Sequence, residues 1–264
     1  MMPDEKINAA ARHLIAQRDA VAPYERLPEA LRPADLDAAY AVQAQVLHLR
    51  EQAGRHLGGW KIGCTTRQMQ QIMGLPGPAY GVVLADCIFT SPAEFSLAYT
   101  VAPIAECEIA MRIASDVPAR KDGHDAASIA LHVGACMAAI ELAEARYPDR
   151  KLLTPPELVA DDVFQRAIIL GPEVTAWRDV DLQAAVGRTM IAGELVGEGK
   201  GRDVMDDPLN ALAWLADALA QAGSCLKAGQ IVLTGAIVNA APVQQGQTAV
   251  CSVDGLGAAR LTIV

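Results

Sequence analysis

The sequence predicts an α+β fold, with a small helical N-terminal part over residues 1–57 and a β-rich domain over residues 58–264. Helix-start signals come early in the chain, whereas most of the later runs are short, apolar and bounded by turn residues. A chain of 264 residues is long enough for one large domain with an ample core.

The N-terminal part contains one well-marked helix. Asp35 is a suitable N-cap, and the helix should continue to about Gln52. Leu36, Tyr40, Gln43 and Leu47 lie on one stripe of this helix.

The remaining elements follow from local pattern. We expect a loop over residues 91–101, a helix over 122–146 and a further loop over 148–156. Asp207 and Pro208 should cap and open a helix that ends at Gly223. Strands are expected at residues 166–170, 189–196, 231–233, 248–253 and 259–264, the last two joined by a turn containing Asp254 and Gly255.

Composition excludes several classes of protein. The net charge is −9 and the chain has no basic stripe, which disfavours nucleic-acid binding. Residues 228–253 carry no charge, but glycine, proline and amide residues divide them into short strands, so no membrane span is expected. The acidic start predicts no secretory signal, and six cysteines without a close pair predict buried thiols in the cytoplasm.

Two glutamates lie two residues apart in an apolar strand-like run over residues 101–113. A period of two places Glu106 and Glu108 on one face, opposite the apolar residues between them. Carboxylates in apolar surroundings require a cation, and oxygen ligands favour a hard ion such as magnesium, manganese or calcium. The alternative is that Glu108 pairs with Arg112 on the same face while Glu106 lies at a rim.

A third carboxylate, Glu141, follows within an alanine-rich segment that has the composition of a packed helix. No basic residue lies four positions further on, where the residue is Ala145. Glu141 is therefore either a third metal ligand or an ordinary glutamate on the surface of a helix.

A lysine occupies a glycine-rich strand near residue 60. Lys61 lies between Trp60 and Ile62, with glycines on both sides of this trio. Burial would lower the pKa of such a lysine or an anion would support its charge, and either suits proton transfer. The alternative is a lysine that extends past Trp60 to water.

Together these residues resemble the 2-keto-4-pentenoate hydratase and 4-oxalocrotonate decarboxylase family of the fumarylacetoacetase superfamily. The resemblance extends from about Asp35 to the C-terminus. It is carried by residues 59–65, 80–86, 105–110, 139–141, 159–161, 207–216 and 226–235. It implies a fumarylacetoacetase-like mixed β-sandwich or roll of antiparallel strands with peripheral helices.

The resemblance also implies roles for individual residues. The metal ligands would be Glu106, Glu108 and Glu141, the catalytic residue Lys61, and the substrate-binding residues Thr65, Thr234 and Gly235. The cofactor would be Mg²⁺ or Mn²⁺. We also expect a homo-oligomer, and the resemblance allows association with another enzyme of the same pathway.

The implied activity is metal-dependent addition of water to a 2-hydroxy-2,4-dienoate, giving a 4-hydroxy-2-oxo acid in aromatic-compound breakdown. The same site would suit a 2-oxo acid decarboxylase, an acylpyruvate hydrolase or a non-catalytic relative that binds a 2-oxo acid. Three departures bear on this choice: Ala79 replaces the usual acidic residue, Asp162 replaces the usual asparagine, and Asp206-Asp207-Pro208 replaces the usual Gly-His-Pro.

Overall fold

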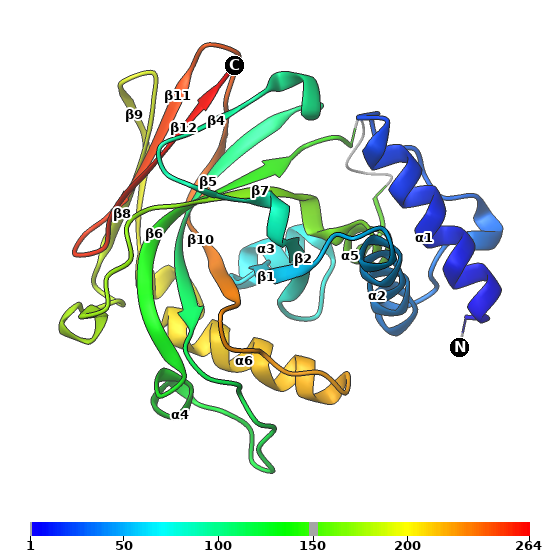
Figure 1. The fold of residues 1–264 in the computed structure, drawn as a ribbon, viewed down its shortest axis with the longest axis horizontal. Coiled ribbons are helices and arrows are strands. Elements are labelled where there is room, and N and C mark those ends of the chain that lie inside the picture. Colours follow the sequence, from blue (N-terminus) through cyan, green and yellow to red (C-terminus); the bar gives the residue numbers. More distant parts are fainter. Residues whose placement is uncertain (1, 148–152) are drawn as a thin grey trace.

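The computed structural model describes residues 2–147 and 153–264, which fold into helices and two β-sheets and confirm the α+β class (Figure 1). The described helices longer than one 3₁₀ turn are α1 (Asp4–Asp19), α2 (Leu36–Gln52), α3 (Arg67–Met73), α4 (Ala126–Ala130), α5 (Pro155–Ala160) and α6 (Pro208–Gln221). None of the helices in these described residues is long and apolar enough to span a membrane.

The larger sheet holds the residues of interest. Its strand order is β2-β1-β10-β5-β6-β7-β3. The strands are β1 (Leu57–Gly63), β2 (Ala79–Leu84), β3 (Ile88–Thr90), β5 (Pro103–Ile113), β6 (Val133–Glu144), β7 (Gln165–Leu170) and β10 (Ile231–Pro242).

The smaller sheet has the order β4-β12-β11-β8-β9. Its strands are β4 (Ala93–Phe95), β8 (Val186–Ile191), β9 (Glu194–Lys200), β11 (Thr248–Val253) and β12 (Gly257–Ile263). Most neighbours in both sheets are antiparallel, but β1–β10, β3–β7 and β4–β12 are parallel, so the architecture is mixed.

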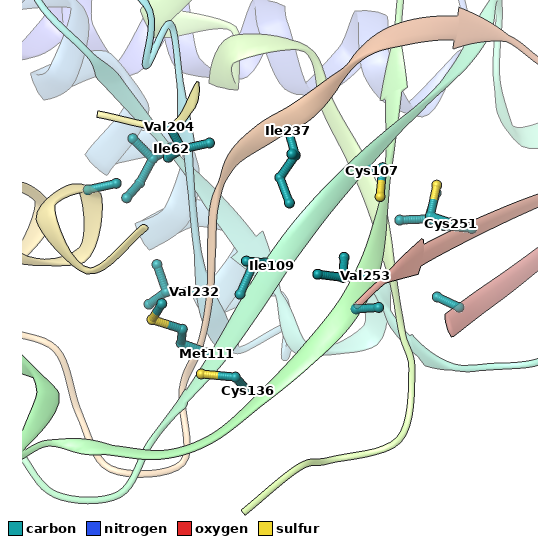
Figure 2. Packing of buried hydrophobic residues seen from close by; sticks show 14 of the residues in the cluster. Ile62, Cys107, Ile109, Met111, Cys136, Val204, Val232, Ile237, Cys251 and Val253 are labelled. Carbon is teal, nitrogen blue, oxygen red and sulfur yellow. The ribbon is translucent and has the colours of Figure 1, made fainter. Parts of the chain in front are cut away.

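The main core lies between the two sheets and α6. On β5, alternate residues such as Cys107, Ile109 and Met111 face this core, where Cys251 and Val253 of β11 meet them (Figure 2). The alternation predicted for residues 101–113 is therefore confirmed. It leaves the glutamates of β5 on the opposite face of the large sheet.

The N-terminal helices pack at the side of the large sheet, next to α5 (Figure 1). They cover the outer edge of β2, an end strand. Gln43 of α2 donates to the Tyr80 carbonyl at 3.1 Å, and Asp162 Oδ1 accepts from the Val82 amide at 2.6 Å. These contacts satisfy backbone groups that a free edge would expose. The division at residues 57 and 58 stays a prediction.

The helix starts predicted at Asp35 and Asp207 are confirmed, because both residues cap a helix. Asp35 accepts from the Ala38 amide at the start of α2, and Asp207 accepts from the Leu209 amide at the start of α6. Gly223 follows α6 in a left-handed conformation, as expected after a helix.

Three predicted elements were wrong. Within residues 122–146, only Ala126–Ala130 (α4) are α-helical and Val133–Glu144 form strand β6. This small-residue strand is buried between β5 and β7, so tertiary packing overrides helix propensity. The predicted loop at 91–101 contains β4, which pairs with β12. The predicted strand at 189–196 is a hairpin, since Ala192 and Gly193 turn the chain with positive φ. Residues 148–152 of the other predicted loop lie outside the described residues, and α5 begins at Pro155.

Candidate metal centre

Strand register brings the three predicted carboxylates together. In the antiparallel β5–β6 pair, Glu106 lies directly opposite Glu141, and Glu108 lies two residues further along β5. Side chains in such positions share one face of the sheet. Glu141 thus reaches the site as a strand residue and not as the helix residue that the sequence suggested.

The cluster is compact and largely buried. One carboxylate oxygen from each glutamate lies within 4.8 Å of the other two. Glu108 and Glu141 have no exposed surface, whereas Glu106 is partly buried. Burial, and then the charges of Glu141 and Glu106, raise the pKa of Glu108 well above its ordinary value.

Strand β10 binds Glu108 and the residue after it. The Gly235 amide donates to Glu108 Oε2 at 2.7 Å, and the hydroxyl of the fully buried Thr234 donates to the Ile109 carbonyl at 2.9 Å. Gly235 has φ of +116°, and a Cβ on it would lie 2.5 Å from Thr65 Cγ2. This position therefore requires glycine, and Thr65 lies against it.

Lys61 joins the same cluster. It is 4% exposed and its Nζ lies 3.1 Å from Glu141 Oε1, so it does not extend to water past Trp60. Burial alone would lower the pKa of Lys61, but the charges of Glu141, Glu106 and Glu108 outweigh it and raise that pKa. The amine is held as an ammonium ion by anionic neighbours.

The alternative pairing of Glu108 is not observed. Arg112 donates instead to Glu173, with Arg112 Nε 2.6 Å from Glu173 Oε1. The glutamates of β5 are therefore left to the site formed with Glu141 and Lys61.

One carboxylate near Lys61 was missed by the sequence analysis. At Gly81, a Cβ would lie 3.2 Å from Lys61 Cδ and 3.1 Å from Asp162 Oδ1, so the two side chains adjoin the same small space. The only signal in the sequence was the replacement of the usual asparagine by Asp162. Ala79, another of the departures, is 1% exposed and packs in an apolar cluster.

The residues present suit a divalent cation. Glu108 Oε1 and Glu141 Oε2 are buried and accept no hydrogen bond within the described part of the chain. Buried carboxylate oxygens of this kind are costly unless a cation or donor meets them. Three carboxylates exceed the charge of the one lysine, and hard oxygen donors suit Mg²⁺ or Mn²⁺.

A separate cavity of about 350 Å³ lies between the N-terminal helices and the edge of the large sheet. Asp162, Gln43 and Val82 line it, but neither the three glutamates nor Lys61 does. Asp162 therefore stands between this cavity and the lysine.

The chain is similar to a known protein family and to enzymes of that family. Residues 78–264 match the model of the fumarylacetoacetate (FAA) hydrolase C-terminal family. The chain is 34% identical over 259 residues to a 2-keto-4-pentenoate hydratase of Paraburkholderia phymatum, covering 97% of this chain and 95% of the relative.

Two solved structures share the fold. A 4-oxalocrotonate decarboxylase from Pseudomonas putida G7, complexed with magnesium and adipate, matches with a TM-score of 0.93 and 24% identity, covering 100% of this chain and 99% of that one. A fumarylpyruvate hydrolase from Pseudomonas aeruginosa, in complex with Mn²⁺ and pyruvate, matches with a TM-score of 0.60 and 18% identity over 80% of this chain and 89% of that one.

Proposed function

Since the chain belongs to the fumarylacetoacetate hydrolase family and to its 2-keto-4-pentenoate hydratase branch, we propose that it is a divalent-metal-dependent hydratase in aromatic-compound breakdown. It adds water to a 2-hydroxy-2,4-dienoate and forms a 4-hydroxy-2-oxo acid. The buried cluster of three carboxylates beside a lysine is the observation that carries this proposal.

We assign the metal ligands to Glu106, Glu108 and Glu141. When bound, Mg²⁺ or Mn²⁺ supplies positive charge that stabilises an enolate of a 2-oxo acid. The Gly235 amide keeps Glu108 oriented toward the cluster, which supports a preformed ligand set.

Lys61 is the proposed proton carrier. Its ammonium group is buried on the same face of the large sheet as the carboxylates, so water does not compete for its proton. The reaction needs a proton at the terminal diene carbon, loss of the enol proton, and addition of water across the remaining double bond. Thr65, Thr234 and Gly235 are assigned to the wall that holds the substrate, supported by the contact of Thr65 with Gly235.

A second candidate is a decarboxylase of the 4-oxalocrotonate type. The fold match to a solved 4-oxalocrotonate decarboxylase supports it, and the same enolate would then take up the electrons left by departing carbon dioxide. Ala79 lacks the carboxyl that hydratases of this branch usually carry, and this favours a catalytically weak relative instead. An acylpyruvate hydrolase or a non-catalytic 2-oxo acid binder would use the same cluster.

The test uses freshly prepared 2-hydroxypenta-2,4-dienoate with Mg²⁺, with and without a chelator. Chelator-sensitive loss of the diene absorbance with 4-hydroxy-2-oxopentanoate as product supports the hydratase. No loss with this dienoate, together with carbon dioxide release from 4-oxalocrotonate, identifies the decarboxylase instead.

Assembly and location are part of the proposal. We infer a homo-oligomer in the cytoplasm, supported by six unpaired cysteines and by exposed apolar side chains such as Ile72, Leu131 and Leu195. Light scattering on the purified chain measures the oligomer directly, and a monomeric mass contradicts it.

A further inference from the structure

We propose that Asp162 is the carboxylate partner of Lys61 in this chain and does the work for which Ala79 has no carboxyl. Asp162 acts through Lys61 and is therefore a positioning residue. This inference rests on the proposed function, because it assigns the proton-transfer role to Lys61.

The space above Gly81 is bordered by both side chains. The position of a Cβ on Gly81 lies 3.2 Å from Lys61 Cδ and 3.1 Å from Asp162 Oδ1, with the Asp162 carbonyl oxygen at 2.9 Å. Glycine leaves this space open between the lysine stem and the carboxylate. Lys61 consequently has Glu141 at its amine, and Asp162 lies across the space above Gly81 from its stem.

The backbone that carries Asp162 is strained. Asp162, Val163 and Phe164 have φ values of 62°, 49° and 66°, three consecutive residues other than glycine in the left-handed region. This conformation is unfavourable for residues with a Cβ and persists only when packing imposes it. The same segment places Val163 Cγ1 2.9 Å from the position of a Cβ on Gly63, which lies 3.3 Å from Lys61 Nζ. The strained segment thus lies next to the amine of Lys61.

Ala79 cannot serve Lys61 itself. It pairs with Gly63 in the β1–β2 ladder, so its backbone lies close to the lysine, yet its side chain is a methyl group in an apolar cluster. A carboxyl that serves the lysine must come from another element. Asp162 enters from the segment after α5, across the edge of β2.

Asp162 also accepts the Val82 amide at 2.6 Å, so a purely structural role is the competing explanation. An asparagine at this position can accept the same hydrogen bond through its amide oxygen. Asp162→Asn therefore removes the charge and keeps the edge contact. Asp203→Asn is a matched control, since Asp203 accepts the Lys200 amide at 2.7 Å at the smaller sheet.

The experiment measures kcat and KM for the dienoate with Mg²⁺, the exchange of the C3 protons of 2-oxobutanoate in D₂O, and Tm. Asp162→Asn should lower kcat and the exchange rate by about 10- to 100-fold, with KM within about twofold and Tm not lowered. Adding Ala79→Asp to Asp162→Asn should recover at least about tenfold of the loss, and Asp203→Asn should behave as wild type.

Wild-type kcat and exchange in Asp162→Asn would overturn the inference. So would a joint loss of activity and Tm that Ala79→Asp does not recover, because Asp162 would then act only on the edge of β2. Exchange that depends on Asp162 in a wild-type protein unable to hydrate the dienoate would refute the hydratase and support this inference. Absence of exchange in the wild type would contradict both.

Discussion

At the scale of single residues, the site is a balance of buried charges. Three carboxylates face one ammonium group. Beside the ion pair between Lys61 and Glu141, the buried oxygens Glu108 Oε1 and Glu141 Oε2 have no donor in the described chain. Such an arrangement is costly for folding unless a cation completes it. The residues that we propose to carry the chemistry are therefore ones that a stable core would avoid.

Replacing Lys61 tests the proton carrier. Lys61→Met keeps an unbranched apolar side chain and removes the amine with its proton, so kcat should fall by about 10²- to 10⁴-fold in the presence of Mg²⁺. Steady-state kinetics with the dienoate measure this. Lys227→Met is the control, because Lys227 forms an exposed ion pair with Asp116, and it should leave kcat unchanged. Equal kcat values for Lys61→Met and wild type would remove Lys61 from the mechanism.

The stability contributed by Asp162 should depend on pH. Burial raises the pKa of Asp162 from 3.8 to about 6, against the opposing charges of Arg18 and Lys61 and with support from Asp161. Because the pKa of Asp162 is raised in the folded state, its contribution to the free energy of unfolding is fully present below about pH 4. That contribution is lost as the pH rises through about 6. Asp162→Asn does not show this loss, because asparagine does not titrate.

The difference in the free energy of unfolding, Asp162→Asn minus wild type, should therefore increase by about 3 kcal/mol between pH 4 and pH 8. Urea denaturation across this range measures the difference. A constant difference between the two proteins would show that Asp162 titrates normally.

At the scale of elements, helices with caps could be predicted and a buried central strand could not. Asp35 and Asp207 mark the starts of α2 and α6 by side-chain hydrogen bonds to nearby amides, which are local interactions. β6 is buried on both faces and rich in alanine, so its composition resembles that of a buried helix. Only its pairing with β5 and β7 makes this segment a strand and not a helix.

The site also contains residues whose positions can be predicted from local sequence and residues whose positions cannot. Glu106 and Glu108 share a face because of a period that can be read within one strand, and Lys61 lies in a strand as expected. The contact of Glu141 with this pair depends on cross-strand register, and the approach of Asp162 to Lys61 depends on a strained segment about 80 residues from its partner strand. The resemblance to a family, and not the local pattern, supplied Glu141.

Gly235 links β10 to the ligand set. Gly235→Ala should lower the free energy of unfolding by about 2–4 kcal/mol and weaken Mg²⁺ binding, since a Cβ would strike Thr65 and φ is +116°. Gly229→Ala is the control, because Gly229 also has positive φ but nothing lies within 4 Å of a Cβ there. Urea denaturation and calorimetry of Mg²⁺ binding compare the two. Equal effects would show that the contact with Thr65 is unimportant.

At the scale of the whole molecule, one buried carboxylate ties the N-terminal helices to the sheet. Asp161 accepts from Arg18 of α1 at 2.9 Å, from Arg146 after β6 at 2.7 Å and from the Tyr147 hydroxyl at 2.6 Å. Burial alone would raise the pKa of Asp161, but the two arginines lower it. The helices that cover β2, and with them the segment bearing Asp162, are held by this network.

Removing one arginine should loosen this connection. Arg18→Met leaves part of the buried charge of Asp161 uncompensated and should cost about 3–5 kcal/mol of unfolding free energy. Arg50→Met, which breaks the partly exposed pair with Asp19, should cost about 0–1 kcal/mol. Urea denaturation of both variants gives the comparison, and similar costs would contradict the role assigned to Asp161.

The most direct test of the central claim is a calorimetric titration of the purified protein with Mn²⁺, with Glu106→Gln, Glu108→Gln and Glu141→Gln as the variants and Glu173→Gln as the surface control. We predict one site per chain in the wild type and in the control, and at least about a tenfold loss of affinity in each of the three variants. Unchanged affinity in all three would show that these carboxylates are not the metal site, and the proposed mechanism would be wrong.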